Sequence, residues 1–216
     1  MVIVAVHTGA VSEPSAFAAG LAAVSKERRE RVLSLAKAED QRRSVCAGLA
    51  LNACLRAVGL PTDAVIARDR WGKPFLSAYP HRHFSLSHSG SYAVCAMADA
   101  PIGIDIQEQR PVAVLPLAER FFAPSEVALL RSLPEVERER AFYRLWTAKE
   151  SILKADGVGL AGGLSRVTVT YGERLSSPSR QLKEYALPGY ALTVCGNGEF
   201  PEDITTIFSC DTALLR

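Results

Sequence analysis

The sequence predicts an α+β fold in which two halves of similar size pack against each other. Segments with strand-like alternation of apolar and polar residues occur in groups, and helical segments occur between the groups. A strand and helices are followed by a run of short strands up to about residue 106, and then helices and strands occur again. The sequence contains no repeat of fixed period and no linker long enough to hold the halves apart.

Each expected element follows from local patterning and from turn residues. Gly59 and Pro61, for example, end an apolar helix, because Gly suits the C-cap and Pro cannot continue a helix. In the first half we expect a strand at 1–6, a helix at 15–24, a charged segment at 26–43, a helix at 44–58, and strands at 64–68, 75–76, 84–87, 92–97 and 102–106. In the second half we expect helices at 115–122, 125–132 and 137–156, and strands at 167–171, 183–187 and 190–195.

Composition excludes several classes of protein. Hydrophobic residues make up 48% of the 216 residues, enough for a buried core, and 25 Lys and Arg against 23 Asp and Glu do not indicate a globally basic nucleic-acid binder. No apolar run is long enough to cross a membrane, and residues 1–6 lack the basic start of a signal peptide. The five cysteines are scattered without a Cys-x-x-Cys pair, so we expect no disulfide framework and a reducing cytoplasm.

Acidic residues of interest occur in two segments. In the expected strand at 102–106, alternation places Asp105 and Gln107 on one face and turns Glu108 to the other. In the helix at 137–156, Glu150 and Lys154 lie one turn apart on the same side. Taken singly, an acid at a sheet edge and a surface ion pair explain both patterns.

Basic and hydroxyl side chains could bind an anion. The turn around Ser87 and His88 offers backbone N–H groups and side-chain donors, although it could be an ordinary polar turn. The Arg-rich segment 26–43 suits phosphate recognition, although a solvated helix face explains it equally well. The glycines at 157–162 fit G-x-G-x-x-G, but they follow a helix, so we expect them to cap that helix and form a loop.

The order of these segments is more specific than any one of them. Gly72-Lys73-Pro74, the segment 84–90 (FSLSHSG), Gly103-Ile104-Asp105 and the segment 146–151 (WTAKES) followed by Lys154 resemble the Sfp-type 4′-phosphopantetheinyl transferases. The resemblance extends over almost the whole chain.

The resemblance implies a pseudo-twofold pair of α/β subdomains, expected at 1–104 and 105–216, each a small antiparallel sheet with a long helix and with coenzyme A bound between them. It further implies transfer of the 4′-phosphopantetheine arm from coenzyme A to a serine of an acyl or peptidyl carrier protein, release of adenosine 3′,5′-bisphosphate, and a requirement for Mg²⁺. Carriers of polyketide, peptide or fatty-acid synthases are the implied partners. We expect a cytoplasmic monomer that binds neither nucleic acid nor membrane.

The resemblance also implies roles for individual residues. Asp105, Gln107 and Glu150 match the metal-binding positions, although many relatives carry Glu where this chain has Gln107. The implied catalytic residues are Asp105, Glu150, which also matches the base for the serine hydroxyl, and Lys154, which matches the pyrophosphate contact. The implied coenzyme A contacts are Arg28, Arg31, Arg43, Gly72, Lys73, Pro74, Ser87, His88 and Lys154.

Three other functions use some of the same residues. A coenzyme A or nucleotide-binding module without transferase activity would keep the basic cluster but would not need Asp105 together with Glu150. An RNA-binding module would use residues 26–43, but the aromatic stacking motifs of RNA readers are missing. A metal phosphohydrolase would release phosphopantetheine to water without a carrier.

Overall fold

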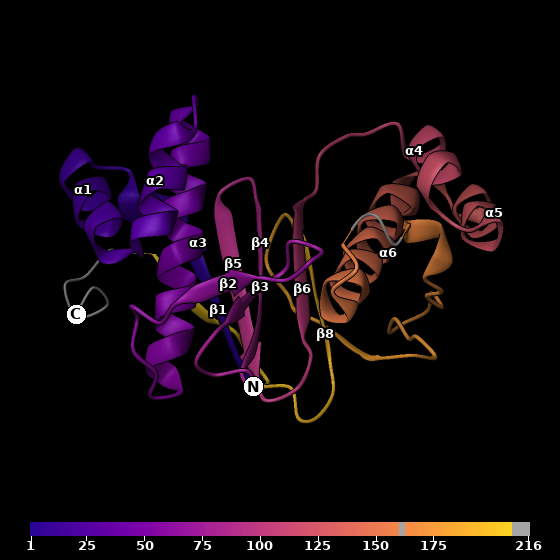
Figure 1. The fold of residues 1–216 in the computed structure, drawn as a ribbon. Helices are drawn as coiled ribbons and strands as arrows, with labels where there is room; N and C mark the ends of the chain where they lie inside the picture. The colour runs from indigo at the N-terminus through magenta and orange to yellow at the C-terminus, as the bar shows by residue number, and fades with distance from the viewer. Residues whose placement is uncertain (160–162, 209–216) are drawn as a thin grey trace.

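The computed structural model describes residues 1–159 and 163–208, and it shows two sheets, each covered by one long helix (Figure 1). The first sheet has the strand order β4-β5-β1-β9 and the second has the order β6-β8-β7. A separate hairpin is formed by β2 and β3. This mixture of small sheets and helices confirms the predicted α+β class.

The first half begins with β1 (Val2–His7) and a short 3₁₀ helix (Thr8–Val11). Its remaining elements are α1 (Pro14–Ala23), α2 (Lys26–Ser34), α3 (Ala38–Ala57), β2 (Ile66–Arg68), β3 (Pro74–Leu76), β4 (His83–Ser89) and β5 (Tyr92–Ala98). The long helix α3 packs on the sheet through residues such as Val45 and Leu55, both buried. The helix starts earlier than predicted: residues 38–43 of the charged segment form its first turns, and residues 26–34 form α2.

The second half contains β6 (Gly103–Glu108), α4 (Val114–Phe121), α5 (Pro124–Ser132), α6 (Glu135–Asp156), a 3₁₀ helix (Leu164–Arg166), β7 (Gln181–Glu184) and β8 (Tyr190–Gly196). Here α6 packs on the sheet formed by β6, β8 and β7, and α4 and α5 cover the side of α6 away from the first half (Figure 1). The opposite face of this sheet contributes Ile104, Ile106 and Val194 to an apolar core shared with Ile3 and Val94 of the first sheet.

Further details differ from the sequence-based expectation. The strand expected at 167–171 is wrong, because only Thr170 forms a bridge, to Ser176. The last strand, β9 (Thr205–Ile207), was not expected; it pairs in parallel with β1 and so returns the end of the described chain to the first sheet. The expected division between residues 104 and 105 falls inside β6.

The cysteines occupy apolar positions. Cys46, Cys54, Cys95 and Cys195 are buried and form no disulfide among the described residues. Cys210 and Gly162, on which two of the sequence expectations partly rest, lie outside the described residues. Gly157 ends α6 with a positive φ of 76°, as expected for a C-cap glycine.

Candidate active site

The two sheets meet where β4 and β6 run side by side in the same direction. No backbone hydrogen bond joins the two strands in the described sheets; three serine hydroxyls of β4 take the place of strand carbonyls. These hydroxyls, here called the serine row, accept the backbone N–H groups of β6: Ser85 from Ile104 at 3.1 Å, Ser87 from Ile106 at 3.4 Å and Ser89 from Glu108 at 2.9 Å. The serine row therefore fixes β6 against the first half.

Asp105 lies at this junction with only 2% of its surface exposed. Its Oδ1 accepts hydrogen bonds from Ser87 Oγ at 2.7 Å and from Lys154 Nζ at 2.6 Å. Its Oδ2 accepts from Gln107 Nε2 at 3.2 Å. The predicted placement of Asp105 and Gln107 on one face of the strand is confirmed, and a buried carboxylate is held by donors from β4, β6 and α6.

The close contact between α6 and β6 requires Gly103. A Cβ at this position would lie 1.8 Å from the carbonyl oxygen of Ser151 and 2.7 Å from the amide nitrogen of Ala155. Both obstacles are helix backbone, which cannot move aside without displacing α6. The glycine two residues before Asp105 therefore lets the last turns of α6 approach the strand, which brings Lys154 within reach of Asp105.

Glu150 and Asp105 place two carboxyl groups at one site. Burial raises the pKa of Glu150 to about 7, and the Asp105 charge adds to this rise, while Lys154 opposes it. Two neighbouring carboxyl groups, with the amide of Gln107 beside them, form a set of oxygen donors suited to a hard divalent cation that retains water ligands. In the described part of the chain, no group of three or more His, Cys, Asp or Glu side chains is arranged to hold a metal ion.

A cluster of cations surrounds His88 on the α2 and α3 side of the same junction. Desolvation lowers the pKa of His88, and four neighbouring cations lower it further: Arg43, Lys154, Arg31 and Arg28. Arg43 donates to Asp40 Oδ1 at 2.6 Å and to the Gly90 carbonyl at 3.2 Å, which fixes its guanidinium beside the turn after β4. The predicted basic residues are thus brought together around one imidazole, a concentration of positive charge that an anion would relieve.

Arg68 extends this cluster through Arg28, although it is not among the site residues expected from the sequence. It lies with Arg28 and Arg31 around a small cavity, and the pKa of Arg28 is lowered first by burial and then by Arg31 and Arg68. Arg68 Nη1 donates to the Gly72 carbonyl at 3.1 Å. No local signal distinguishes Arg68 from Arg70, because only the pairing of β2 with β3 turns Arg68 toward α2.

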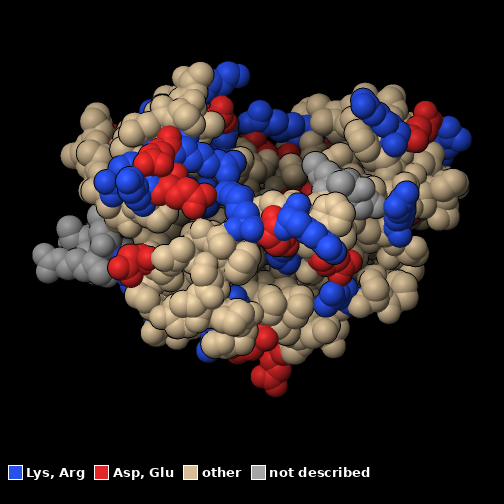
Figure 2. Space-filling view, viewed as in Figure 1, with Lys and Arg blue, Asp and Glu red and all other residues tan. Residues whose placement is uncertain are grey.

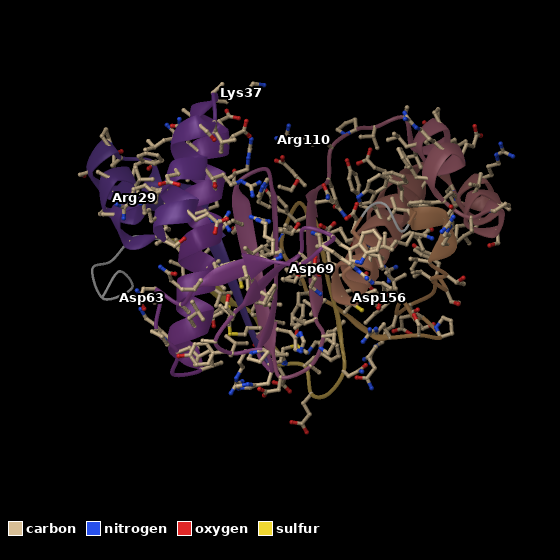
Figure 3. All side chains as sticks on the ribbon, viewed as in Figure 1. Arg29, Lys37, Asp63, Asp69, Arg110 and Asp156 are labelled. Atoms are coloured by element: carbon tan, nitrogen blue, oxygen red, sulfur yellow. The ribbon has the colours of Figure 1, made fainter. Side chains whose placement is uncertain are left out.

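The β2–β3 hairpin covers part of the junction and reaches the end of α6. A cavity of about 250 Å³ is lined by Gly72, Lys73 and Pro74 of the hairpin and by Lys154 of α6. Lys73 Nζ donates to the carbonyls of Lys154 at 2.6 Å and Ala155 at 3.0 Å, so its ammonium caps the C-terminus of α6. In Figure 3 the hairpin residue Asp69 lies near Asp156 at this end of α6, and both carboxylates act on the pKa of Lys73.

Basic side chains gather around the hollow between the two halves (Figure 2). Arg110 lies at its rim, on the chain between the two halves (Figure 3). A larger cavity of about 520 Å³ lies elsewhere, between α6 and the β7–β8 turn, and contains none of the predicted site residues. Its Arg144 is already paired with Glu184 at 2.6 Å. The chemistry-bearing residues therefore converge on the junction of the two sheets.

Comparison with known proteins agrees with this arrangement. Residues 12–100 match the family model described as 4′-phosphopantetheinyl transferase, N-terminal, and residues 101–195 match the 4′-phosphopantetheinyl transferase superfamily. The chain is 33% identical to 4′-phosphopantetheinyl transferase Sfp of Bacillus subtilis over 85% of this chain and 87% of that protein. It is 36% identical to 4′-phosphopantetheinyl transferase psf-1 of Bacillus pumilus over 73% and 71% of the two chains. It is also 47% identical to 4′-phosphopantetheinyl transferase HetI of a Nostoc species over 42% and 40% of the two chains. The chain therefore belongs to the 4′-phosphopantetheinyl transferase family.

Proposed function

We propose that the junction between β4, β6 and α6 is where this enzyme transfers the 4′-phosphopantetheine arm of coenzyme A to a serine of a carrier protein. Coenzyme A and a carrier protein are the two substrates of this family's reaction. The cations around His88 suit the phosphates of the nucleotide end, and Lys154 suits the pyrophosphate. The cavity beside Gly72 and Pro74 suits the nucleotide.

The roles of the two carboxylates follow from their surroundings. The serine oxygen of the carrier attacks the phosphorus that bears the pantetheine arm, and the bond from that phosphorus to adenosine 3′,5′-bisphosphate breaks. Glu150 takes the serine proton, a task suited to a carboxylate whose pKa is about 7. Lys154 balances the charge on the departing phosphate, while its hydrogen bond to Asp105 keeps its ammonium at the junction.

Asp105, Gln107 and Glu150 are proposed to hold Mg²⁺. When bound, Mg²⁺ neutralises charge on the phosphate oxygens of coenzyme A. The donor set fits a cation that keeps several waters, because it offers two carboxylates and one neutral amide oxygen. Gln107 carries no charge where many relatives have Glu, so metal affinity is expected to be lower here without loss of the site.

The observation that supports transfer most directly is the pairing of Asp105 and Glu150 beside the cationic cluster. A module that only binds coenzyme A needs the cations but gains nothing from two mutually repelling carboxyl groups. The test is mass spectrometry of apo-carrier proteins incubated with coenzyme A and Mg²⁺. A mass gain of one phosphopantetheine arm is expected; no gain on fatty-acid, polyketide and peptide carriers would contradict the proposal, as would release of free phosphopantetheine without a carrier.

Partner class and cellular setting belong to the same proposal. Carriers of polyketide, peptide or fatty-acid synthases are the proposed substrates, and a monomer in the cytoplasm is the proposed form. The part of the chain that the structure describes has no helix both long enough and apolar enough to cross a membrane. Size-exclusion chromatography with light scattering tests the monomer.

A further inference from the structure

We propose that Ser87 is a positioning residue for Asp105 and not a ligand of the coenzyme A phosphate. This inference rests on the proposed role of Asp105 and adds a residue from the other half of the molecule to that role. The resemblance alone groups Ser87 with His88 as phosphate contacts. In the structure the two side chains diverge, because Ser87 is buried whereas His88 is exposed in the same strand.

The hydrogen-bonding capacity of Ser87 is already used. A hydroxyl has one hydrogen to donate and lone pairs to accept with. Ser87 Oγ accepts the N–H of Ile106 at 3.4 Å, and it donates its hydrogen to Asp105 Oδ1 at 2.7 Å. Because Asp105 is a carboxylate, the hydrogen bond from Ser87 to Asp105 is charge-assisted and stronger than the bond from the Ile106 N–H to Ser87. With only 8% of Ser87 exposed, no free donor remains to face a ligand.

The contact fixes the orientation of the carboxylate. Oδ1 of Asp105 is held between Ser87 and Lys154, and Oδ2 is held by Gln107. Without Ser87, Lys154 is the only one of these donors left on Oδ1. The carboxylate then turns toward the ammonium, which strengthens that pair and withdraws both groups from their proposed partners. Ser87 therefore keeps Asp105 and Lys154 in a geometry that leaves each available.

The serine row provides matched controls for this role. Ser89 makes the same kind of bond to β6 as Ser87, at the shorter distance of 2.9 Å to the Glu108 N–H. The carboxylate of Glu108 lies near Gly90, away from Asp105. The side chains that donate to Asp105 in the described structure are Ser87, Lys154 and Gln107, and Ser89 is not among them. Removing either hydroxyl weakens the junction between the sheets, but only Ser87 also touches the site.

The experiment compares Ser87→Ala, Ser89→Ala and Ser87→Thr in the full chain. Three quantities are measured: kcat with an apo-carrier protein, the Mg²⁺ concentration for half-maximal rate, and the Kd of coenzyme A by calorimetry without metal. For Ser87→Ala we expect kcat to fall about tenfold or more, as for loss of one charge-assisted hydrogen bond, and the Mg²⁺ requirement to rise. Its metal-free Kd for coenzyme A should change by less than about twofold. Ser89→Ala should retain kcat within about twofold, and Ser87→Thr should recover most of the rate, because its hydroxyl is kept.

Two results would overturn the inference. If Ser87→Ala and Ser89→Ala lose the same small amount of rate, the serine row only joins the sheets. If Ser87→Ala instead weakens metal-free coenzyme A binding about tenfold while kcat is kept, Ser87 is a ligand contact. The wild-type protein distinguishes these results from failure of the proposed function: an inactive wild type contradicts the function, whereas an active one with either result contradicts only the role of Ser87.

Discussion

Lys73 provides a prediction that separates a structural role from ligand binding. Its ammonium donates to the last carbonyls of α6, those of Lys154 and Ala155. Hydrogen bonds to a charged group contribute about 1.5–3 kcal/mol each, and the cation also faces the negative end of the helix dipole. Burial opposes these gains, since it lowers the pKa of Lys73. A net contribution of about 2 kcal/mol to the free energy of unfolding follows.

The change that tests this is Lys73→Met, which keeps most of the apolar side chain and removes the charge. For a protein of this size, 2 kcal/mol corresponds to a decrease in Tm of about 4–8 °C. Thermal and urea unfolding of the ligand-free protein measure it, with Lys37→Met, at an exposed position on the N-terminal side of α3 (Figure 3), as the control. If Lys73→Met melts like wild type and yet binds coenzyme A about tenfold more weakly, the ammonium acts on the nucleotide and the capping argument is refuted.

The other predictions concern the carboxylates and a buried ion pair. Asp105→Ala and Glu150→Ala should each abolish transfer to an apo-carrier, whereas Gln107→Ala should leave measurable activity. Gln107→Glu should lower the Mg²⁺ concentration for half-maximal rate. If Gln107→Ala is as inactive as Asp105→Ala, Gln107 is an essential residue and this expectation is wrong. Because the pKa of Glu150 is raised to about 7 in the metal-free protein and Mg²⁺ binds the ionised carboxylate, the Kd of Mg²⁺ should fall as pH rises between about 6 and 8. The raised pKa of Glu150 also affects stability in the presence of EDTA. Between about pH 4.5 and 7 the Glu150 carboxyl keeps its proton in the folded state and loses it in the unfolded state, so the free energy of unfolding should fall as pH rises through this range. If neither quantity changes with pH, both expectations are wrong. Lys149 is fully buried against Glu126 at 2.7 Å, so Lys149→Met should lower the free energy of unfolding by about 3–5 kcal/mol. Adding Glu126→Gln should recover part of that loss, and no recovery in urea unfolding would show that the uncompensated charge is not the cause.

The sequence predicted the parts of the site that depend on local periodicity. Strand alternation alone places Asp105 beside Gln107 and turns Glu108 away, and the structure confirms both placements. Helical spacing likewise predicted that Glu150 and Lys154 share a side of α6, and both act on the electrostatics of this junction. These relations hold within one element, so no knowledge of the packing is needed.

Contacts between distant elements were not predictable in the same way. The serine row joins residues 19 positions apart, and alternation shows only that the serines share a face of β4, not which strand they meet. β9 has three residues and forms because β1 offers an open edge. The expectation of a strand at 167–171 arose because Val167, Val169 and Tyr171 alternate with two threonines, which is the pattern of a strand. In the structure Val167 and Val169 are buried without forming a strand. Their burial comes from packing against the core around α6, and the carbonyl of Val167 accepts the Lys149 ammonium instead of a strand partner.

The polar contacts around Asp105 explain why both halves are needed for one site. The family models divide the chain between residues 100 and 101, yet Ser87 lies before that division and Asp105 and Lys154 lie after it. The hydrogen bond from Lys73 to the Lys154 carbonyl at the end of α6 likewise joins a residue before this division to one after it. Apolar packing between the sheets, as between Val94 and Ile104, has no directional preference and could hold them at several offsets. Hydrogen bonds at fixed spacing select one of these offsets, and that offset brings a carboxylate of the second half to the cationic cluster of the first.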